Sequence, residues 1–212
     1  MFALSVVFLQ CREILPFPPP GVNGSYGISG LVTSENGAPL DSIAVWLTYT
    51  LVRVDFRPMD TSQIFVNTRS VIYRVDVFNL HGLPVRNLFY GYPAHGVFPL
   101  YSWDSKDSNG NYVASGKYLI KYQQDSTIIK IDPYLASGLL TTITDRNGYF
   151  SLGDDNLPIG ELFDRYSSDG TFEGVFQVTS DVNLLLTHGL LRGQFTVPLQ
   201  LNNVYHGNFI LR

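Results

Sequence analysis

The stretch that decides the fold runs from Tyr73 to Tyr122, and its centre is WDSKDSNGNYVASGKY, from Trp103 to Tyr118. Apolar residues occupy every second position on both sides of that centre, in VIYRVDV before it and in YLIKY after it. This period of two predicts a half-buried strand on each side. Between the strands, Asn109-Gly110 and Ser115-Gly116 supply residues that tolerate positive φ. We therefore expect the chain to reverse twice within a compact antiparallel unit.

The same stretch contains short motifs: Asn79–Gly82, Trp103-Asp104, Asn109-Gly110 and Ser115–Tyr118. With these motifs, the chain from Tyr73 to Tyr122 resembles the immunoglobulin-like domain of flagellar hook-capping proteins. The resemblance implies a structural and assembly module without catalytic residues, in which Trp103 has a packing role. Ser105 stands where that family usually has glycine, and this departure implies a different local turn.

The composition of the 212 residues favours strands separated by tight turns. Aromatic residues make up 14% and charged residues 15% of the chain, and there are 19 glycines and 12 prolines. This mixture is typical of all-β proteins. The length suffices for one large sandwich or two small domains. The net charge of -4 provides no basic surface to neutralise phosphates, which argues against nucleic acid as a partner.

The first 24 residues predict a signal-like segment followed by a tether. Met1–Gln10 is apolar and too short to span a bilayer, but it has the length of the apolar part of a secretion signal. It ends at Cys11, the single cysteine, in a pattern that resembles a bacterial lipoprotein cleavage site. Two alternatives follow: a lipid anchor on Cys11, or a buried first strand with an inert thiol. The prolines between residues 16 and 20 favour an extended spacer.

A second resemblance involves two segments, one before and one after the hook-capping-like stretch. The sequences ISGLVTSENGAPLDSIAVWL, from Ile28 to Leu47, and TTITDRNGYFSL, from Thr141 to Leu152, resemble the two signatures of carboxypeptidase regulatory-like domains, which are small transthyretin-like sandwiches. The hook-capping-like stretch lies between these signatures. Insertion into a surface loop costs little when the ends of the inserted domain lie close together.

We therefore expect an all-β fold of two immunoglobulin/transthyretin-like β-sandwiches, one inserted into a loop of the other. Residues 25–52 and 136–212 form the expected outer sandwich, and residues 53–135 form the inserted one. In the outer sandwich, a strand from Ile43 to Leu51 has one apolar face. A helix is expected from Pro158 to Tyr166, with the proline in its first turn.

Four further strands are expected near the end of the chain, at residues 174–179, 182–186, 194–201 and 206–211. In the third of these strands, Phe195, Val197 and Leu199 face one way. Pro198 has no N–H to donate to a neighbouring strand, so this strand is expected at the edge of a sheet. An edge strand can accept a strand from another chain, which makes this segment a candidate for partner contact.

No catalytic, cofactor or metal site is predicted. The four histidines are isolated from other ligand residues, and no nucleophile or phosphate-binding motif is present. Asp104 and Asp107, or the pair Asp154-Asp155, are the strongest alternatives for calcium. The spacing lacks the bidentate glutamate that a calcium loop requires. Capping of the local backbone by these side chains is the expected role.

Aromatic residues offer an alternative to a purely structural role. Trp46 lies on the opposite face of its strand from the apolar stripe, so we expect it to be exposed or packed against the inserted domain. With Tyr49, Tyr90 and Tyr92 it forms a candidate surface for a glycan or a peptide. The main hypothesis is a non-catalytic, exported cell-envelope protein with a structural, assembly or adhesion role, including self-assembly. Its expected partners are proteins or copies of itself, and a lipid on Cys11 is its only expected contact with a membrane.

Overall fold

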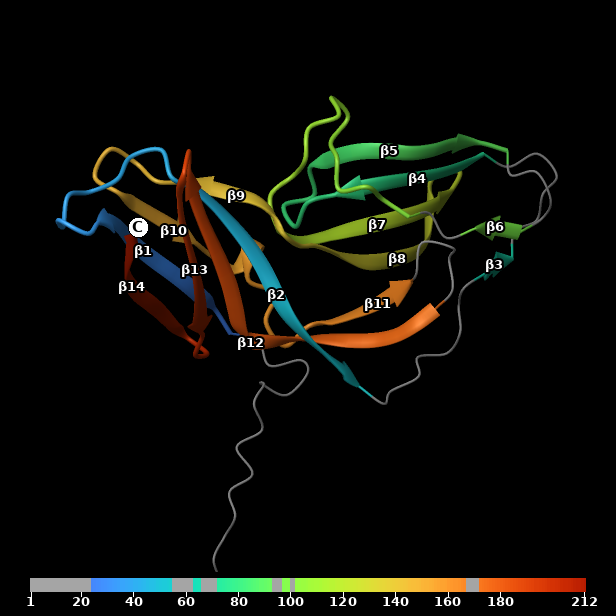
Figure 1. The fold of residues 1–212 in the computed structure, drawn as a ribbon. Coiled ribbons are helices and arrows are strands. Elements are labelled where there is room, and N and C mark those ends of the chain that lie inside the picture. Colours follow the sequence, from blue (N-terminus) through green and yellow to red (C-terminus); the bar gives the residue numbers. More distant parts are fainter. Residues whose placement is uncertain (1–23, 55–62, 66–71, 93–96, 100–101, 167–171) are drawn as a thin grey trace, which may run out of the picture.

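The computed structural model describes residues 24–54, 63–65, 72–92, 97–99, 102–166 and 172–212 (Figure 1). Their regular structure is β-strand apart from one short 3-10 helix, η1, which confirms the predicted all-β class. The apolar start of the chain, Cys11 and the prolines lie outside the described residues. The elements are β1 (Tyr26–Ser34), β2 (Ala44–Val54), β3 (Gln63–Phe65), β4 (Tyr73–Phe78), β5 (Pro84–Gly91), β6 (Val97–Pro99), β7 (Gly116–Gln124), β8 (Thr127–Ala136), β9 (Leu139–Ile143), β10 (Tyr149–Leu152), η1 (Asp154–Asn156), β11 (Leu162–Tyr166), β12 (Phe172–His188), β13 (Leu191–Pro198) and β14 (Asn203–Leu211).

Strands β1, β2 and β9 to β14 form two sheets, which we call the outer unit (Figure 1, left). One sheet has the order β10-β1-β14, and the other has the order β11-β12-β2-β9 with β13 added to β12. The first and last strands, β1 and β14, run parallel to each other, whereas the other pairs in this unit are antiparallel. Side chains from both sheets meet in one hydrophobic core.

The central strand β2 presents the predicted apolar face to that core. Ile43, Val45, Leu47 and Tyr49 are all buried. Strand β12 pairs with β2 and is a single strand of 17 residues. Two separate strands were expected here, and a register shift between Val178 and Val182 marks the position of the expected break. The two segments stay in one strand because β2 pairs with both of them.

The predicted helix from Pro158 to Tyr166 is wrong. The backbone at Gly160 has a φ of 81°, which no α-helix accommodates, and its N–H donates to Val178 O at 2.8 Å. Strand β11 begins two residues later, at Leu162, and pairs with β12. Hydrogen bonding to a neighbouring strand thus decides the local structure, against a weak helical pattern.

Strands β3 to β8 form the inserted unit (Figure 1, right). Its main sheet has the order β5-β4-β7-β8, and β3 pairs with β6. The strands up to Val54 and those after Ala136 belong to the sheets of the outer unit, and the strands between them belong to the inserted unit. Both transitions lie next to the predicted boundaries of the inserted domain. A second, smaller core lies on this sheet and is formed by Tyr73, Val75, Val77, Trp103, Ile120 and Tyr122.

Four turns in the two units share one geometry. Each turn has five residues. The N–H of the first residue donates to the carbonyl of the fifth, and the N–H of the fourth residue donates to the carbonyl of the first. The fourth residue is always glycine, with φ between 77° and 84°. This left-handed backbone favours glycine, which explains the Asn-Gly and His-Gly pairs in the sequence. The turns are Ser34–Ala38, Asn79–Leu83, Asp107–Asn111 and Asp145–Tyr149.

Two glycines make room for aromatic rings inside the outer unit. Gly30 on β1 and Gly207 on β14 are register partners. The rings of Phe150 and Phe209 lie over this position with centroids 5.7 Å apart. A Cβ on Gly30 would lie 2.1 Å from the Phe150 ring and 2.8 Å from the Phe209 ring. The absence of a side chain at Gly30 is therefore a packing requirement of this core.

We expect Gly30→Ala to lower the free energy of unfolding by about 2 kcal/mol, because the added methyl group overpacks the core. Urea unfolding followed by tryptophan fluorescence measures this change. Gly153→Ala is the matched control, since a Cβ there meets nothing within 4 Å and the backbone is extended. Equal stabilities of the two variants would contradict the packing role of Gly30.

Candidate functional site

Strand β13 is an edge strand in the part of the chain that the structure describes. It pairs with β12 alone, starting from the two-residue turn at Gly189 and Leu190. Leu199 N donates to Ser180 O at 2.9 Å, just beyond the last ladder pair. Antiparallel partners alternate between hydrogen-bonded and non-bonded pairs. It follows that Arg192, Gln194 and Thr196 turn their N–H and C=O groups away from β12.

The side chains that were predicted to mark this edge strand point into the core. Phe195 packs edge-on against Phe209 with ring centroids 4.9 Å apart. Val197 and Leu199 are buried. Pro198 is exposed opposite Asp181, at the end of the strand, and has no N–H. The apolar side chains therefore anchor β13 to its own unit, and the outward main chain is what another molecule can contact.

Apart from β14, the other edge strands are shorter or irregular. Strand β5 begins with a proline and has two register shifts, β8 contains a proline and one shift, and β11 has one shift. Strands β9 and β10 have only five and four residues. Strands β13 and β14 have eight and nine residues and no register shift. Bulges and prolines protect sheet edges from pairing with other chains, so β13 and β14 are the least protected edges described here. Both lie at the end of the molecule that is far from the inserted unit (Figure 1).

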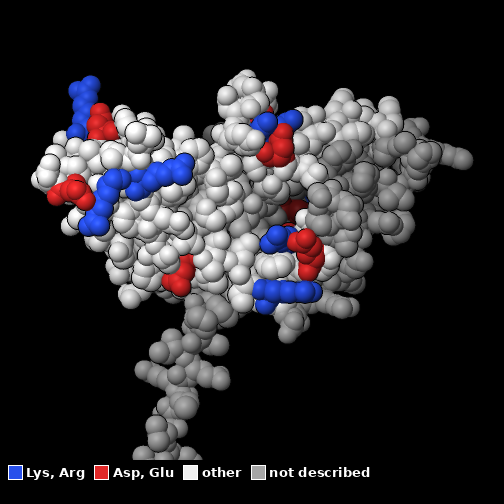
Figure 2. Space-filling view, in the orientation of Figure 1, with Lys and Arg blue, Asp and Glu red and all other residues white. Residues whose placement is uncertain are grey.

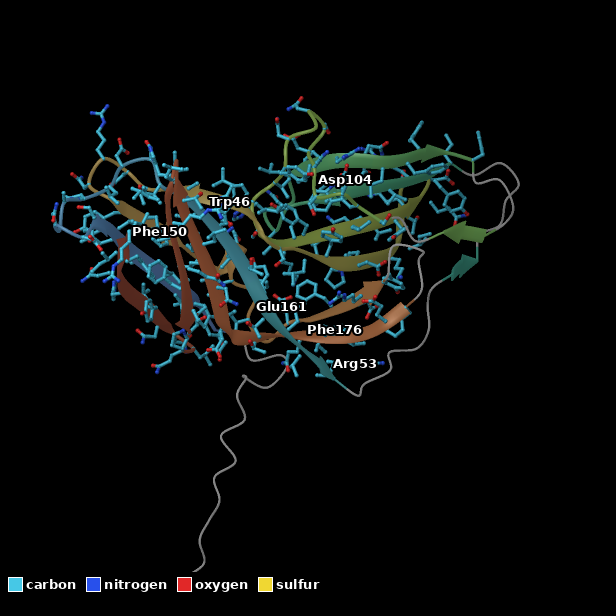
Figure 3. The ribbon with its side chains drawn as sticks, viewed as in Figure 1. Trp46, Arg53, Asp104, Phe150, Glu161 and Phe176 are labelled. Atoms are coloured by element: carbon cyan, nitrogen blue, oxygen red, sulfur yellow. The ribbon has the colours of Figure 1, made fainter. Side chains whose placement is uncertain are left out.

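The four predicted aromatic residues do not form one surface. Trp46 is half-buried on the outer face of β2, where Leu140 and Leu185 are its register partners, and its Nε1 donates to Thr187 Oγ1 at 3.1 Å. Tyr90 and Tyr92 belong to the inserted unit, at and just beyond the end of β5, and are 65% and 63% exposed. Figure 3 shows Trp46 in the outer unit, well away from Asp104 in the inserted unit.

The placement of Tyr49 on a binding surface is wrong. Its ring is 6% exposed and belongs to the core of the outer unit. Its hydroxyl donates to Asn156 O at 2.6 Å, and burial raises the pKa of the phenol. Because Tyr49 continues the apolar stripe of β2 in a period of two, its position in the core follows from the same pattern that predicts the strand.

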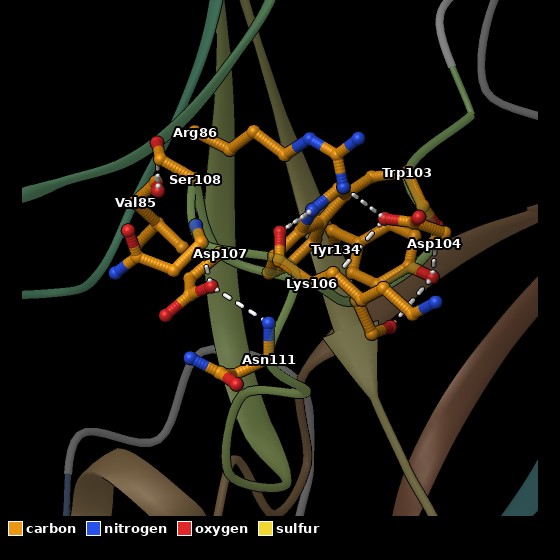
Figure 4. A network of polar contacts seen from close by, with 11 residues as sticks. Val85, Arg86, Trp103, Asp104, Lys106, Asp107, Ser108, Asn111 and Tyr134 are labelled. Carbon is orange, nitrogen blue, oxygen red and sulfur yellow. Dashed lines mark hydrogen bonds and ion pairs between the residues drawn. The ribbon is translucent and has the colours of Figure 1, made fainter.

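The loop between β6 and β7 is organised around Trp103 (Figure 4). The indole is buried between Tyr118 and Tyr134, with ring centroids 5.0 and 5.1 Å away, and its Nε1 donates to Lys106 O at 2.8 Å. The packing role that the resemblance implies for this residue agrees with these contacts. A groove of about 370 Å³ lies beside the ring and is lined by Arg86, Asn87, Leu88, Ser102, Trp103 and Asp104.

The carboxylates of the loop are engaged by the protein itself. Asp104 Oδ1 accepts from Arg86 at 2.6 Å and from Lys106 N at 3.2 Å. Burial opposes ionisation of Asp104, but these donors outweigh it and lower its pKa. Asp107 Oδ1 accepts from the N–H groups of Asn111 and Asn109, which lower the pKa of Asp107. The predicted backbone capping thus accounts for both residues.

The two units are joined through a buried serine. Ser115 Oγ donates to Leu47 O at 2.8 Å and accepts from Leu139 N at 2.9 Å, so it bridges β2 and β9 of the outer unit. Ser115 O in turn accepts from Asn156 Nδ2 at 2.8 Å. A Cβ on the next residue, Gly116, would lie 2.5 Å from Asp155 O. The start of β7 is therefore held directly against the outer unit.

Charged residues make further contacts between the units. Lys117 pairs with Glu161, and His81 Nε2 lies 2.6 Å from Asp155 Oδ2. Figure 2 shows that positive and negative side chains on the visible face lie mostly next to each other, without a large patch of one sign. The two ion pairs thus add to the contacts of Ser115 and Gly116 at the junction.

Strands β8 and β11 lie side by side across the junction (Figure 1). On β8, Lys130 Nζ is 2.9 Å from Asp132 Oδ2, and both side chains are largely buried. Burial raises the pKa of Asp132 despite this pairing. On β11, the side chain of Asp164 is exposed, but partial desolvation of its carboxylate and then the charge of Asp132 raise its pKa. Lys130 therefore pairs with a carboxylate of its own strand, and the charge of that carboxylate acts on a second carboxylate in the other unit.

Sequence patterns do not reveal the junction. Ser115-Gly116 predicts a turn, and nothing in the sequence shows that the hydroxyl bridges strands more than twenty residues away on either side. The Lys130-Ile-Asp132 alternation places both charged residues on one face of β8, which is a signal for partial burial against another charge. Asp164, whose pKa is raised in part by the charge of Asp132, lies in the segment for which the sequence predicts a helix.

Comparison with known proteins finds no matching family model, no matching curated protein and no matching solved structure. In the described ranges, no helix has the length and apolar character needed to cross a membrane. The same residues contain no group of three or more His, Cys, Asp and Glu side chains placed to hold a metal ion. Function is therefore inferred from the geometry of the edges, the loops and the junction.

We expect Ser115→Ala to lower the free energy of unfolding by about 2 kcal/mol, because Leu47 O and Leu139 N lose a buried partner. Ser151→Ala is the matched control, since Ser151 is exposed on β10. Urea unfolding gives the stability, and hydrogen exchange gives the protection of the Leu139 amide. Unchanged protection of that amide in the Ser115 variant would show that the bridge does not hold β9.

The carboxylates at the junction predict a dependence of stability on pH. Because folding raises the pKa of Asp132 and Asp164, their contribution to stability is complete below the unfolded value of about 3.9 and is lost as the pH rises through the folded value. At pH 7, Asp164→Asn should raise the free energy of unfolding by about 0.5 kcal/mol, since Asp164 is largely exposed and screened.

At pH 3.5 this difference between the variant and the unmodified chain should disappear. Asp41→Asn, at an exposed turn, is the control at both pH values. A stabilisation by Asp164→Asn that is equal at pH 7 and pH 3.5 would show that charge at the junction is not its cause.

Proposed function

We propose that the chain is a non-catalytic, exported protein of the cell envelope with a structural, assembly or adhesion role. In this proposal, two immunoglobulin/transthyretin-like sandwiches, one inserted in the other, contact protein partners through their edges and loops. The observation that carries the proposal is the free, regular edge of β13, which turns main-chain donors and acceptors outward at Arg192, Gln194 and Thr196.

The β13 edge suits strand addition for two reasons. Its apolar side chains are already buried in its own unit, so a partner strand would add hydrogen bonds without rearranging the core. Each main-chain hydrogen bond contributes about 1 kcal/mol, so a few of them add up to useful affinity. Pro198 interrupts the row of donors at one end and limits how far an added strand can extend.

The junction also favours a structural role. Ser115, Asn156 and the close approach of Gly116 to Asp155 fix the inserted unit relative to the outer sheets. The free edge and the loops of the inserted unit consequently lie at opposite ends of one body (Figure 1). A subunit of this shape can contact one neighbour through its edge and another through its loops.

Export is proposed from the sequence of the first 24 residues, which include the apolar segment and Cys11. A lipid on Cys11 would hold the body at a membrane through the proline-containing spacer, and this would be its only membrane contact. The position of the β13 edge does not distinguish between a lipid anchor on Cys11 and a buried first strand that contains Cys11. Nucleic acid is not proposed as a partner, since charged side chains of both signs are mixed over the visible face (Figure 2).

An accessory module that binds a glycan or a peptide is the second candidate. The exposure of Tyr90 and Tyr92 on the inserted unit favours it, because neighbouring exposed tyrosines can stack on a sugar or contact a peptide. Trp46 is too far from this pair to join it, and Tyr49 is buried. The candidate surface therefore reduces to two of the four aromatic residues.

Photo-crosslinking in the organism that makes the protein separates the two functions. A photoreactive phenylalanine derivative is placed at Gln194 in one variant and at Tyr90 in the other, both of which are exposed. We expect covalent adducts with envelope proteins or with the chain itself at position 194 and none at position 90. Adducts only at position 90 would favour the binding module, and adducts at neither position would contradict assembly through the edge.

A further inference from the structure

We propose that two copies of this chain pair antiparallel through their β13 strands, with the two Gln194 residues opposite each other on a two-fold axis. This inference rests on the proposed assembly role and names the partner and the register. It starts from the outward groups of the edge, which belong to Arg192, Gln194 and Thr196. A two-fold axis through Gln194 places Arg192 of each copy opposite Thr196 of the other.

This register uses every outward donor of the regular edge. Antiparallel partners in hydrogen-bonded pairs exchange both of their main-chain bonds. The Gln194 pair and the two Arg192–Thr196 pairs therefore form about six hydrogen bonds. The only charged side chain of the edge, Arg192, faces threonine and not a second arginine. The pairing therefore meets no direct repulsion between like charges.

Pro198 and the turn before β13 favour this register over the two registers that are shifted by two residues. A shift by two residues in one direction would place Pro198 opposite Arg192 of the other copy, whose carbonyl would then face a ring without an N–H. A shift in the other direction would draw the residues of the Gly189-Leu190 turn into the ladder. The register centred on Gln194 is thus the longest one in which the paired residues are all regular strand and none is proline.

The same register accounts for an exposed leucine. Leu190, in the turn before β13, is 101% exposed, although a two-residue turn has no need of an apolar side chain there. With Gln194 on the axis, Leu190 lies opposite Pro198 of the other copy, at both ends of the pairing. An apolar contact would then cover each leucine.

The outer face of the sheet continues across the axis in this arrangement. Leu140, Trp46, Leu185 and Gln194 are register partners in one row across β9, β2, β12 and β13. In the pair, the second copy extends this row symmetrically. Strand β14 forms no hydrogen-bonded ladder with β13, and the side chains that it places against β13 include Phe209 at Phe195 and Leu211 at Gly193.

Disulfide trapping tests the register. The experiment uses the full chain with Cys11→Ser, so that the introduced cysteine is the only thiol. Paired residues have Cα atoms about 5.5 Å apart, within the range of a disulfide. Under mild oxidation, Gln194→Cys should therefore yield a disulfide-linked dimer as its main product on a non-reducing gel.

Arg192→Cys and Thr196→Cys are the matched controls, since both positions are equally part of the exposed edge. In the proposed register, each lies about 14 Å along the strand from its own copy in the partner, too far for a disulfide. Each variant alone should stay monomeric on the gel, whereas a mixture of the two should yield a crosslinked heterodimer. Equal crosslinking of all three single variants would overturn the register.

Leu190→Asp tests the pairing without a cysteine. It should shift the mass measured by light scattering from dimer to monomer at a fixed concentration, while far-ultraviolet circular dichroism stays unchanged. A monomeric mass for the unmodified chain at high concentration, with no Gln194→Cys dimer, would overturn pairing between copies. If photo-crosslinking at position 194 then still yields adducts with other envelope proteins, the assembly role stands and this inference alone fails.

Discussion

One buried hydroxyl lies at the centre of the junction between the two units of this protein. Ser115 Oγ lies between Leu47 on β2 and Leu139 on β9, and both of its hydrogen bonds are made away from solvent. A buried main-chain group without a partner costs more than an ordinary hydrogen bond contributes, so this position tolerates few other side chains. The strand that follows, β7, is central to the inserted sheet. The placement of that whole sheet therefore depends on a contact made by a turn residue.

The junction leaves the opposite end of the outer unit free for contacts. Strands β9 and β11 lie near the inserted unit, whereas β13 and β14 do not (Figure 1). Among the edge strands of the outer unit, β9 and β11 are short or bulged, whereas β13 and β14 are longer and regular. The two edges beside the inserted unit are thus better protected than β13 and β14. This distribution is what a subunit needs if it is to pair at one end only.

Local patterns in the sequence predict the strands and turns and fail on pairings between distant segments. The stripe from Ile43 to Leu51 and the turn at Asn109-Gly110 follow from side-chain period and backbone preference, and both agree with the structure. The parallel pairing of β1 with β14 joins the two ends of the described chain and leaves no local signal. The segment after Pro158 shows the same limit, since β12 converts a weak helical pattern into a strand. The prediction that Tyr49 lies on a binding surface is wrong because Tyr49 belongs to the apolar stripe of β2, which faces the core.

The parallel pairing of β1 and β14 also determines how the outer unit resists a mechanical load. Tyr26 lies beside Asn203 and Ser34 lies beside Leu211, so the two strands enter and leave the sheet in the same direction. Tension between the residue before β1 and the residue after β14 pulls the two strands past each other along their length. All of the hydrogen bonds between them then bear the load together, in shear, and must break at nearly the same time. The outer unit should therefore resist tension that is applied along these two strands in opposite directions.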